Sequence, residues 1–311
     1  GVLQRPGGAL PASGGARFAF TLPLEGEPPE LETERPLVAR ALSISVLEGS
    51  LHAVMLGVSE TYLGAFAVEL GHGPENIAIL VTLPLFLGAA SQLASGTLSR
   101  LFGRKPLAVV GAALQALCHS TFIVIALTGE TGLWPLLLGK CLFWVSGGVM
   151  APAWSDWITS LTSGIPRERY FARRFATINF TLLVAFCASG WLLQHAGNRP
   201  LLTYAVLFLV GLCARLASAV ALAVQADPEP RSVERTSGWQ RTRAAVREGR
   251  FHVVIYLALM MFGASVAIPF FTPYMLQHLG LSYGQFTALS AVSIVTKAIV
   301  FPTLHRVSRS I

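Results

Sequence analysis

Eight apolar runs separated by short polar turns make up most of this chain. They lie at roughly 46–69, 76–99, 106–128, 133–157, 174–195, 199–224, 251–276 and 284–305. Each run has the ~20 residues that a helix needs to cross ~30 Å of hydrocarbon at a rise of ~1.5 Å per residue. The runs lack the period-two alternation of a membrane barrel, and a lipid-exposed backbone has to satisfy its own hydrogen bonds. The pattern therefore predicts an all-α, polytopic transmembrane helical bundle.

The charged residues support this interpretation through their number and their placement. Only 13% of the residues are charged, against about 25% in a typical soluble domain. The basic residues behind the net charge of +7 gather in the turns after the second, fourth, sixth and eighth runs, whereas the intervening turns contain only Arg199. Basic turns mark the cytoplasmic side of a membrane protein. This placement favours a multi-pass protein with a cytoplasmic N-terminus over a nucleic-acid-binding protein.

The polar segments also divide the chain into domains. A Pro- and Gly-rich start without apolar periodicity predicts disorder, and a long basic segment after the sixth run predicts a linker. Segment 95–101 resembles segment 301–307, which indicates a parallel repeat of six-span units whose second copy is incomplete at its C-terminal side. The predicted parts are a disordered cytoplasmic tail (1–44), a six-helix N-terminal bundle (45–224), a cytoplasmic linker (225–250) and the first two helices of a C-terminal bundle (251–311).

A motif between the second and third runs resembles that of a known family. Gly96-x-Leu98-x-x-x-x-Gly103-Arg104-Lys105 is similar to the loop 2–3 motif of the major facilitator superfamily, Gly-x-Leu-x-Asp-Arg/Lys-x-Gly-Arg/Lys-Lys. Arg100 occupies the position at which that motif carries an acid, which indicates either a different gate or another acid in its place. The stretch 152–174, with its paired tryptophans and its arginines, resembles the span 4–5 region of a bacterial branch of the superfamily.

The resemblance implies a permease of the bacterial inner (plasma) membrane. Such a protein has twelve spans in two bundles around a cavity lined by spans 1, 4, 7 and 10, of which this chain supplies spans 1 to 8. The implied function is secondary active transport of a small solute by alternating access, driven by a proton or another gradient. Polar and hydrophobic drug-like substrates both stay open.

Charged residues within the runs are candidate functional residues, because an unpaired charge in hydrocarbon costs roughly 2.5–3.5 kcal/mol on insertion scales. Glu60 and Lys140 lie at similar depth in the first and fourth runs, so we expect them to pair, on the substrate path if the resemblance holds. Lys297, in the eighth run, is a further candidate for that path. Glu48 and His52 lie four residues apart on one helix face and are a candidate proton-coupling pair. A purely structural role is the competing interpretation of each pair.

Two further groups are candidate gates. The inner one combines the loop motif with charged residues at the ends of the fourth and fifth runs, and its members are Gly96, Arg100, Gly103, Arg104, Lys105, Asp156, Arg173 and Arg174. Asp156 is the candidate replacement for the missing motif acid, as a partner of one of these arginines. The outer group is an irregular aromatic stretch in the seventh run, with Pro269, Pro273 and Tyr274.

The sequence contains no catalytic, cofactor or metal motif in a plausible setting, and neither an ATP-binding GxxxxGK[ST] nor an HExxH segment occurs. We therefore expect a monomeric transporter whose partners are a small-molecule substrate and the lipid bilayer, without nucleic acid. Two alternatives stay open. One is a membrane-embedded enzyme that acts on lipids, with Glu48, His52 and Asp156 as its only candidate residues, and the other is a truncated scaffold that does not transport.

Overall fold

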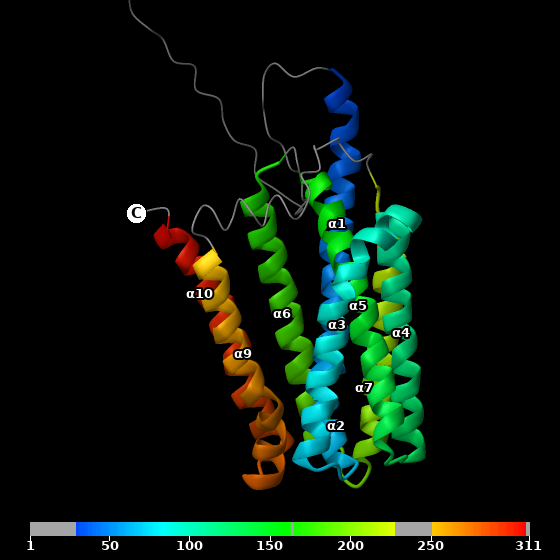
Figure 1. Cartoon of the computed structure of the whole chain (residues 1–311), viewed down its shortest axis with the longest axis vertical. Coiled ribbons are helices and arrows are strands. Elements are labelled where there is room, and N and C mark those ends of the chain that lie inside the picture. Colours follow the sequence, from blue (N-terminus) through cyan, green and yellow to red (C-terminus); the bar gives the residue numbers. More distant parts are fainter. Residues whose placement is uncertain (1–28, 163–164, 228–250, 309–311) are drawn as a thin grey trace, which may run out of the picture.

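The computed structural model describes residues 29–162, 165–227 and 251–308, with side chains over 37–162, 165–227 and 252–296. Every secondary-structure element in these ranges is helical (Figure 1). The elements are α1 (Pro29–Val58), η1 (Glu60–Tyr62), α2 (Leu63–Glu69), α3 (Pro74–Phe102), α4 (Arg104–Thr128), α5 (Leu133–Leu161), α6 (Arg167–Gln194), α7 (Pro200–Val224), α9 (Phe251–Pro273), η2 (Tyr274–His278) and α10 (Tyr283–Ser308). η1 is a 3₁₀ turn and η2 is a π turn.

Seven helical segments among the described residues are long and apolar enough to cross a membrane. They match the first seven predicted runs, and α1, η1 and α2 together form the first of them, Leu37–Glu69. The eighth run, 284–305, corresponds to α10, which is helical but is not one of the seven. The predicted polytopic helical fold is confirmed.

The first helix begins earlier than the sequence analysis predicts. α1 starts at Pro29, within segment 1–44, for which a disordered tail is expected. Val38, Leu42 and Val46 pack on apolar residues of α4, α5 and α7. Their spacing of four places them on one helix face, so the buried stripe of the first span continues beyond the apolar run. Charged and proline residues around this stripe hide it from a hydropathy window. The part of the segment before Pro29, and most of the predicted linker, lie outside the described residues.

Consecutive helices run between two opposite ends of the bundle. We call them the Gly71 end, where α2 leads into α3, and the Gly103 end, where α3 leads into α4. Gly71 and Gly103 have φ of 84° and 86°, a backbone conformation that favours glycine. Between the two ends, α3 and α5 cross so closely that a Cβ on Gly148 would collide with the carbonyl oxygen of Gly88. α4 packs between α5 and α7, and α1 packs against α6 and α7.

Hydrogen bonds near the Gly71 end attach the α9–α10 pair to the other described helices. They join Thr287 Oγ1 to Tyr62 Oη (2.7 Å), Gln277 Nε2 to His72 O (3.0 Å), Tyr283 Oη to Glu69 Oε2 (2.7 Å) and the Gly284 N–H to Gln194 Oε1 (2.8 Å). In Figure 1 the pair leans away from α6 and α3 toward the Gly103 end. The side chains of residues 252–268 in α9 are accordingly exposed.

The predicted irregular segment of the seventh span begins later than expected. α9 stays helical through Pro269 to Pro273, and the irregular part is the π turn that starts at Tyr274. The two prolines are buried, whereas Tyr274 is 51% exposed and stacks on His278 with ring centroids 5.1 Å apart. This aromatic stretch lies at the Gly71 end, and its role as a gate stays a prediction.

Candidate functional site

The first membrane span is interrupted at Ser59, between α1 and η1. Ser59 has φ −125° and ψ −64°, outside the helical region. Its hydroxyl lies 2.8 Å from Met55 O, and the Thr61 hydroxyl donates to Gly57 O at 3.1 Å. The Ser59 hydroxyl thus adds to the backbone bond from the Ser59 N–H to Met55 O (3.0 Å), and both hydroxyls help to satisfy carbonyls at the end of α1, which surrounding lipid could not do. Glu60 is the residue that follows the interruption.

Glu60 faces two polar groups of α5. Lys140 Nζ lies 3.5 Å from Glu60 Oε1, and Trp144 Nε1 donates to the same oxygen at 3.0 Å. The Lys140 and Glu60 side chains are 6% and 14% exposed. The structure therefore brings together the two charges that the sequence analysis pairs across the first and fourth spans. Their place on a substrate path stays a prediction.

Ser59 also contacts a buried histidine of α4. His119 is 1% exposed, with Nδ1 2.8 Å from Gln115 O and Nε2 2.8 Å from Ser59 Oγ. A carbonyl oxygen only accepts, so Nδ1 carries the proton of the neutral ring and Nε2 accepts from the Ser59 hydroxyl. The single hydroxyl proton thus has two acceptors in reach, His119 Nε2 and Met55 O. The sequence analysis does not select His119, because a lone histidine within an apolar run forms no motif.

A second polar cluster lies closer to the Gly103 end and centres on Arg215 of α7, which is 1% exposed. Its Nε and Nη2 donate to Gln115 Oε1 at 2.9 and 2.6 Å, and its Nη1 donates to Ser218 Oγ at 2.7 Å. Glu48 of α1 supplies the opposite charge, with Oε1 3.6 Å from Nη1. A buried guanidinium needs both a counter-charge and hydrogen-bond acceptors, and this cluster provides both.

Glu48 has other partners than His52 among the described residues, and the role of the two residues in proton coupling stays a prediction. Glu48 Oε2 instead lies 3.3 Å from Arg174 Nη2 of α6, in addition to the contact with Arg215. The Nδ1 atom of His52 is buried and has no hydrogen-bond partner in the described part of the chain. The prediction considered neighbours on one helix, whereas guanidinium groups from α6 and α7 are stronger partners for a carboxylate than an imidazole is. Glu48 therefore joins three helices.

At the Gly103 end, Arg104 forms an ion pair with an acidic residue of the segment after α7. Arg104 Nη2 lies 2.7 Å from Asp227 Oδ1, and Nη1 donates to Ser160 Oγ at 2.7 Å. Lys105 Nζ donates to Gln225 O at 2.8 Å. The two basic residues of the loop motif thus hold the start of the segment that follows α7. The sequence analysis misses Asp227 because it assigns this residue to the linker.

The other predicted members of this gate do not gather around Asp156, which is exposed. Arg104 and Arg174 contact Asp227 and Glu48 instead, and the role of Asp156 as a replacement for the motif acid stays a prediction. Arg100 Nε donates to Gly96 O at 3.1 Å within its own helix. Arg173 is exposed at the start of α6.

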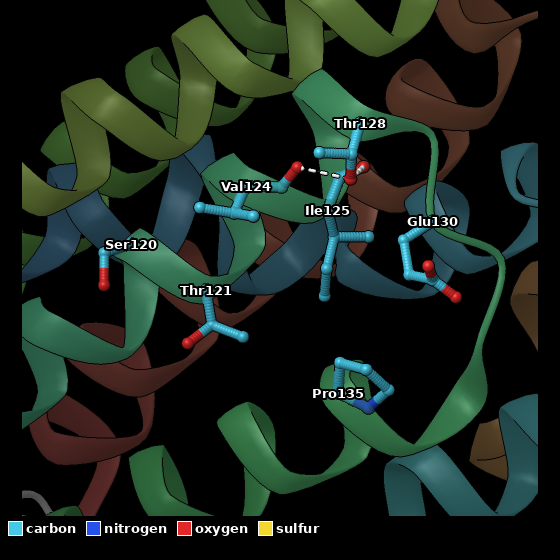
Figure 2. Close-up of a pocket in the computed structure, with 7 residues that line it drawn as sticks. All are labelled: Ser120, Thr121, Val124, Ile125, Thr128, Glu130 and Pro135. Atoms are coloured by element: carbon cyan, nitrogen blue, oxygen red, sulfur yellow. Dashed lines mark hydrogen bonds between the residues drawn. The ribbon is translucent and has the colours of Figure 1, made fainter.

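Two hollows lie away from the Glu60–Lys140 pair. Figure 2 shows the first, of about 480 Å³, where the end of α4 meets the start of α5. Its lining residues are Ser120, Thr121, Val124, Ile125, Thr128, Glu130 and Pro135. The second, of about 410 Å³, lies beside η2. Neither hollow is lined by Glu60 or Lys140, so the candidate site is identified by its buried charges. Lys297, the third predicted residue of the path, lies outside the described side chains.

The match to known families decides the class of protein. A profile of the Major Facilitator Superfamily matches residues 47–311. The chain belongs to this superfamily. No curated protein matches it. Major facilitator proteins are membrane transporters, and the seven apolar helices agree with that class. The chain is therefore a multi-pass membrane transporter of the major facilitator type.

Membership of the superfamily also bears on the enzyme alternative. Superfamily members move solutes rather than transform them. Glu48, one of the candidates for lipid chemistry, is held by Arg174 and Arg215, and Asp156 is exposed at the Gly103 end. Within the described residues, no three His, Cys, Asp or Glu side chains are grouped to hold a metal ion.

Proposed function

We propose that this protein is a secondary active transporter that moves a small solute by alternating access, with the solute passing the Glu60–Lys140 pair. Three observations support the proposal: membership of the superfamily, the interrupted first span, and the buried charges beside the interruption. Broken helices place polar groups at substrate sites in many transporters. The observation that carries the proposal is the buried ion pair itself, because charges within a membrane are costly and are retained for function.

The two helical groups are the candidate moving parts. α1 to α7 form one group, and the α9–α10 pair belongs to the other. One turn beyond Glu60, a Cβ built on Gly64 would lie 3.4 Å from Thr272 Cγ2, so the two groups touch there. Glu60 thus lies next to their contact, on the side of the Gly103 end, where α9 is exposed. This placement supports a state that is closed at the Gly71 end.

The basic turns support an orientation with the Gly103 end in the cytoplasm. Arg100, Arg104, Lys105 and the arginines that open α6 lie at this end, whereas Glu69 and Glu75 flank the turn at the opposite one. The proposed state is then open to the cytoplasm. Labelling of single-cysteine variants with an impermeant thiol reagent tests the orientation: the 129–132 turn should react from outside the cell, and the 163–166 turn only from the cytoplasmic side.

Uptake into proteoliposomes tests the function. A solute screen with and without a pH gradient identifies a substrate and reports whether protons are coupled. Glu60→Gln, which keeps the size of the side chain but removes its charge, should lower the uptake rate about tenfold or more, the scale expected for losing one charge-assisted contact. Glu130→Gln is the matched control, because this carboxylate accepts from the Gly132 N–H in the α4–α5 turn. Unchanged uptake by a correctly inserted Glu60→Gln variant contradicts the proposed path.

A further inference from the structure

The Lys140 ammonium has more hydrogen-bond capacity than its surroundings use. Lys140 is 5% exposed, and the partner that the described residues give it is Glu60 Oε1, 3.5 Å from Nζ. That distance exceeds the 2.7–3.2 Å of an ordinary N–H···O hydrogen bond. An ammonium group has three N–H donors, and leaving buried donors unpaired is costly. Within the described residues, Nζ therefore has no acceptor at ordinary hydrogen-bond distance.

Glu60, in contrast, has an acceptor oxygen to which no donor is bonded in the described part of the chain. Both of its polar contacts fall on Oε1, which receives Trp144 Nε1 at 3.0 Å and faces Lys140 Nζ. Within the described part of the chain, Oε2 has no such partner. An ionised carboxylate offers about four lone-pair positions, so Oε2 is free to accept from a donor. The side chain is 14% exposed, which leaves it within reach of a small molecule.

We propose that the Glu60–Lys140 pair binds a zwitterion of the α-amino-acid type, with the ligand carboxylate at Lys140 Nζ and the ligand ammonium at Glu60 Oε2. The inference rests on the proposed function and names its substrate class. The ammonium and carboxylate of an α-amino acid are separated by one carbon. They therefore match an ion pair held at 3.5 Å, and the four charges alternate in sign.

A ligand with a single charge fits this site less well. Glu60 and Lys140 together carry no net charge, so the pair favours neither cations nor anions as a whole. A cation satisfies Oε2 and leaves the Lys140 donors unpaired, and an anion does the reverse. A zwitterion satisfies both groups. The indole N–H of Trp144 fixes Oε1 and so directs the open oxygen of the carboxylate toward the ligand.

The test compares ligands that differ by one charge. Binding is measured as the rise in melting temperature of the purified protein in detergent, first with the common α-amino acids. Two analogues of the best ligand follow, an amine without the carboxylate and a carboxylate without the amine. We expect each analogue to bind about tenfold or more weakly, because each leaves one buried partner unsatisfied.

Two variants make the expectation residue-specific. Lys140→Met should remove the preference over the amine analogue, and Glu60→Gln should remove the preference over the carboxylate analogue. Glu130→Gln should keep both preferences. Size-exclusion chromatography checks that each variant is folded, and either variant alone tests one half of the proposal. A merely structural ion pair predicts that both variants weaken all three ligands equally.

The inference is overturned if no amino acid stabilises the protein, if a singly charged analogue binds as tightly, or if the variants do not discriminate. Its failure is distinguishable from that of the proposed function. Uptake of a solute of another class would end the amino-acid proposal and leave transport standing. Selective amino-acid binding without any uptake would support the site and contradict transport.

Discussion

Replacing Glu48 by glutamine tests the buried charge cluster of the first bundle. The variant keeps the shape of the side chain and removes the carboxylate that contacts Arg215 and Arg174, at 3.6 and 3.3 Å. At an effective dielectric constant near 20, each contact corresponds to about 4–5 kcal/mol of Coulomb energy. Removing one partner of a buried pair typically costs about 3–5 kcal/mol, because the other charge stays buried and unpaired. Arg215 is 1% exposed and cannot regain water without unfolding.

The assay is thermal unfolding of purified variants in detergent. At about 2–4 °C per kcal/mol for a chain of this size class, the Glu48→Gln variant should melt roughly 10 °C below the wild type. Glu75→Gln, at the exposed start of α3, serves as the control and should change the melting temperature by about 2 °C or less. The double variant Glu48→Gln/Arg215→Gln should lose less than the sum of its single changes. A Glu48→Gln protein that melts within about 2 °C of the wild type refutes the reasoning.

Three further predictions concern other parts of the chain. Gly148→Ala should reduce the yield of folded protein because its Cβ meets the α3 backbone, whereas Gly96→Ala, with open space around its Cβ position, should be tolerated; fluorescence-detected size-exclusion chromatography compares them. Asp227→Asn should cost at most about 1 kcal/mol, since Arg104 and Asp227 are partly exposed, but should speed proteolysis after α7. Burial lowers the pKa of His72 below 6.5, so the unfolded chain binds more protons and stability should fall below about pH 6.5; the fall in melting temperature on acidification should be smaller in His72→Gln.

Hydropathy and charge placement predict the helices and their alternation, because lipid imposes strong rules on composition. The same rules predict the contact of Glu60 with Lys140, since two opposite charges at one depth have few other partners. They do not predict the partner of Glu48, because its arginines come from helices more than a hundred positions away in the chain. They also miss the start of α1, where a short apolar stripe lies among prolines and charged residues.

Asp227 and His119 show a different limit. Asp227 follows the last apolar residue of α7, so composition alone assigns it to a linker, and only the folded chain brings it to Arg104. His119 becomes a candidate functional residue only through its contacts, in which Ser59 and Gln115 bind its two ring nitrogens. Neither residue belongs to a motif that a single sequence reveals, because each role depends on which helices lie side by side.

The attachment of α9 and α10 near one end of the bundle has a mechanical consequence. α9 has 23 residues and so measures about 35 Å. A tilt of about 10° around the tethered end would shift its free end by about 6 Å, close to one helical pitch. The four tethering hydrogen bonds would stay near the pivot and stretch little during such a swing. A small rotation of this helix pair at its tethered end would therefore produce a large displacement at its far end.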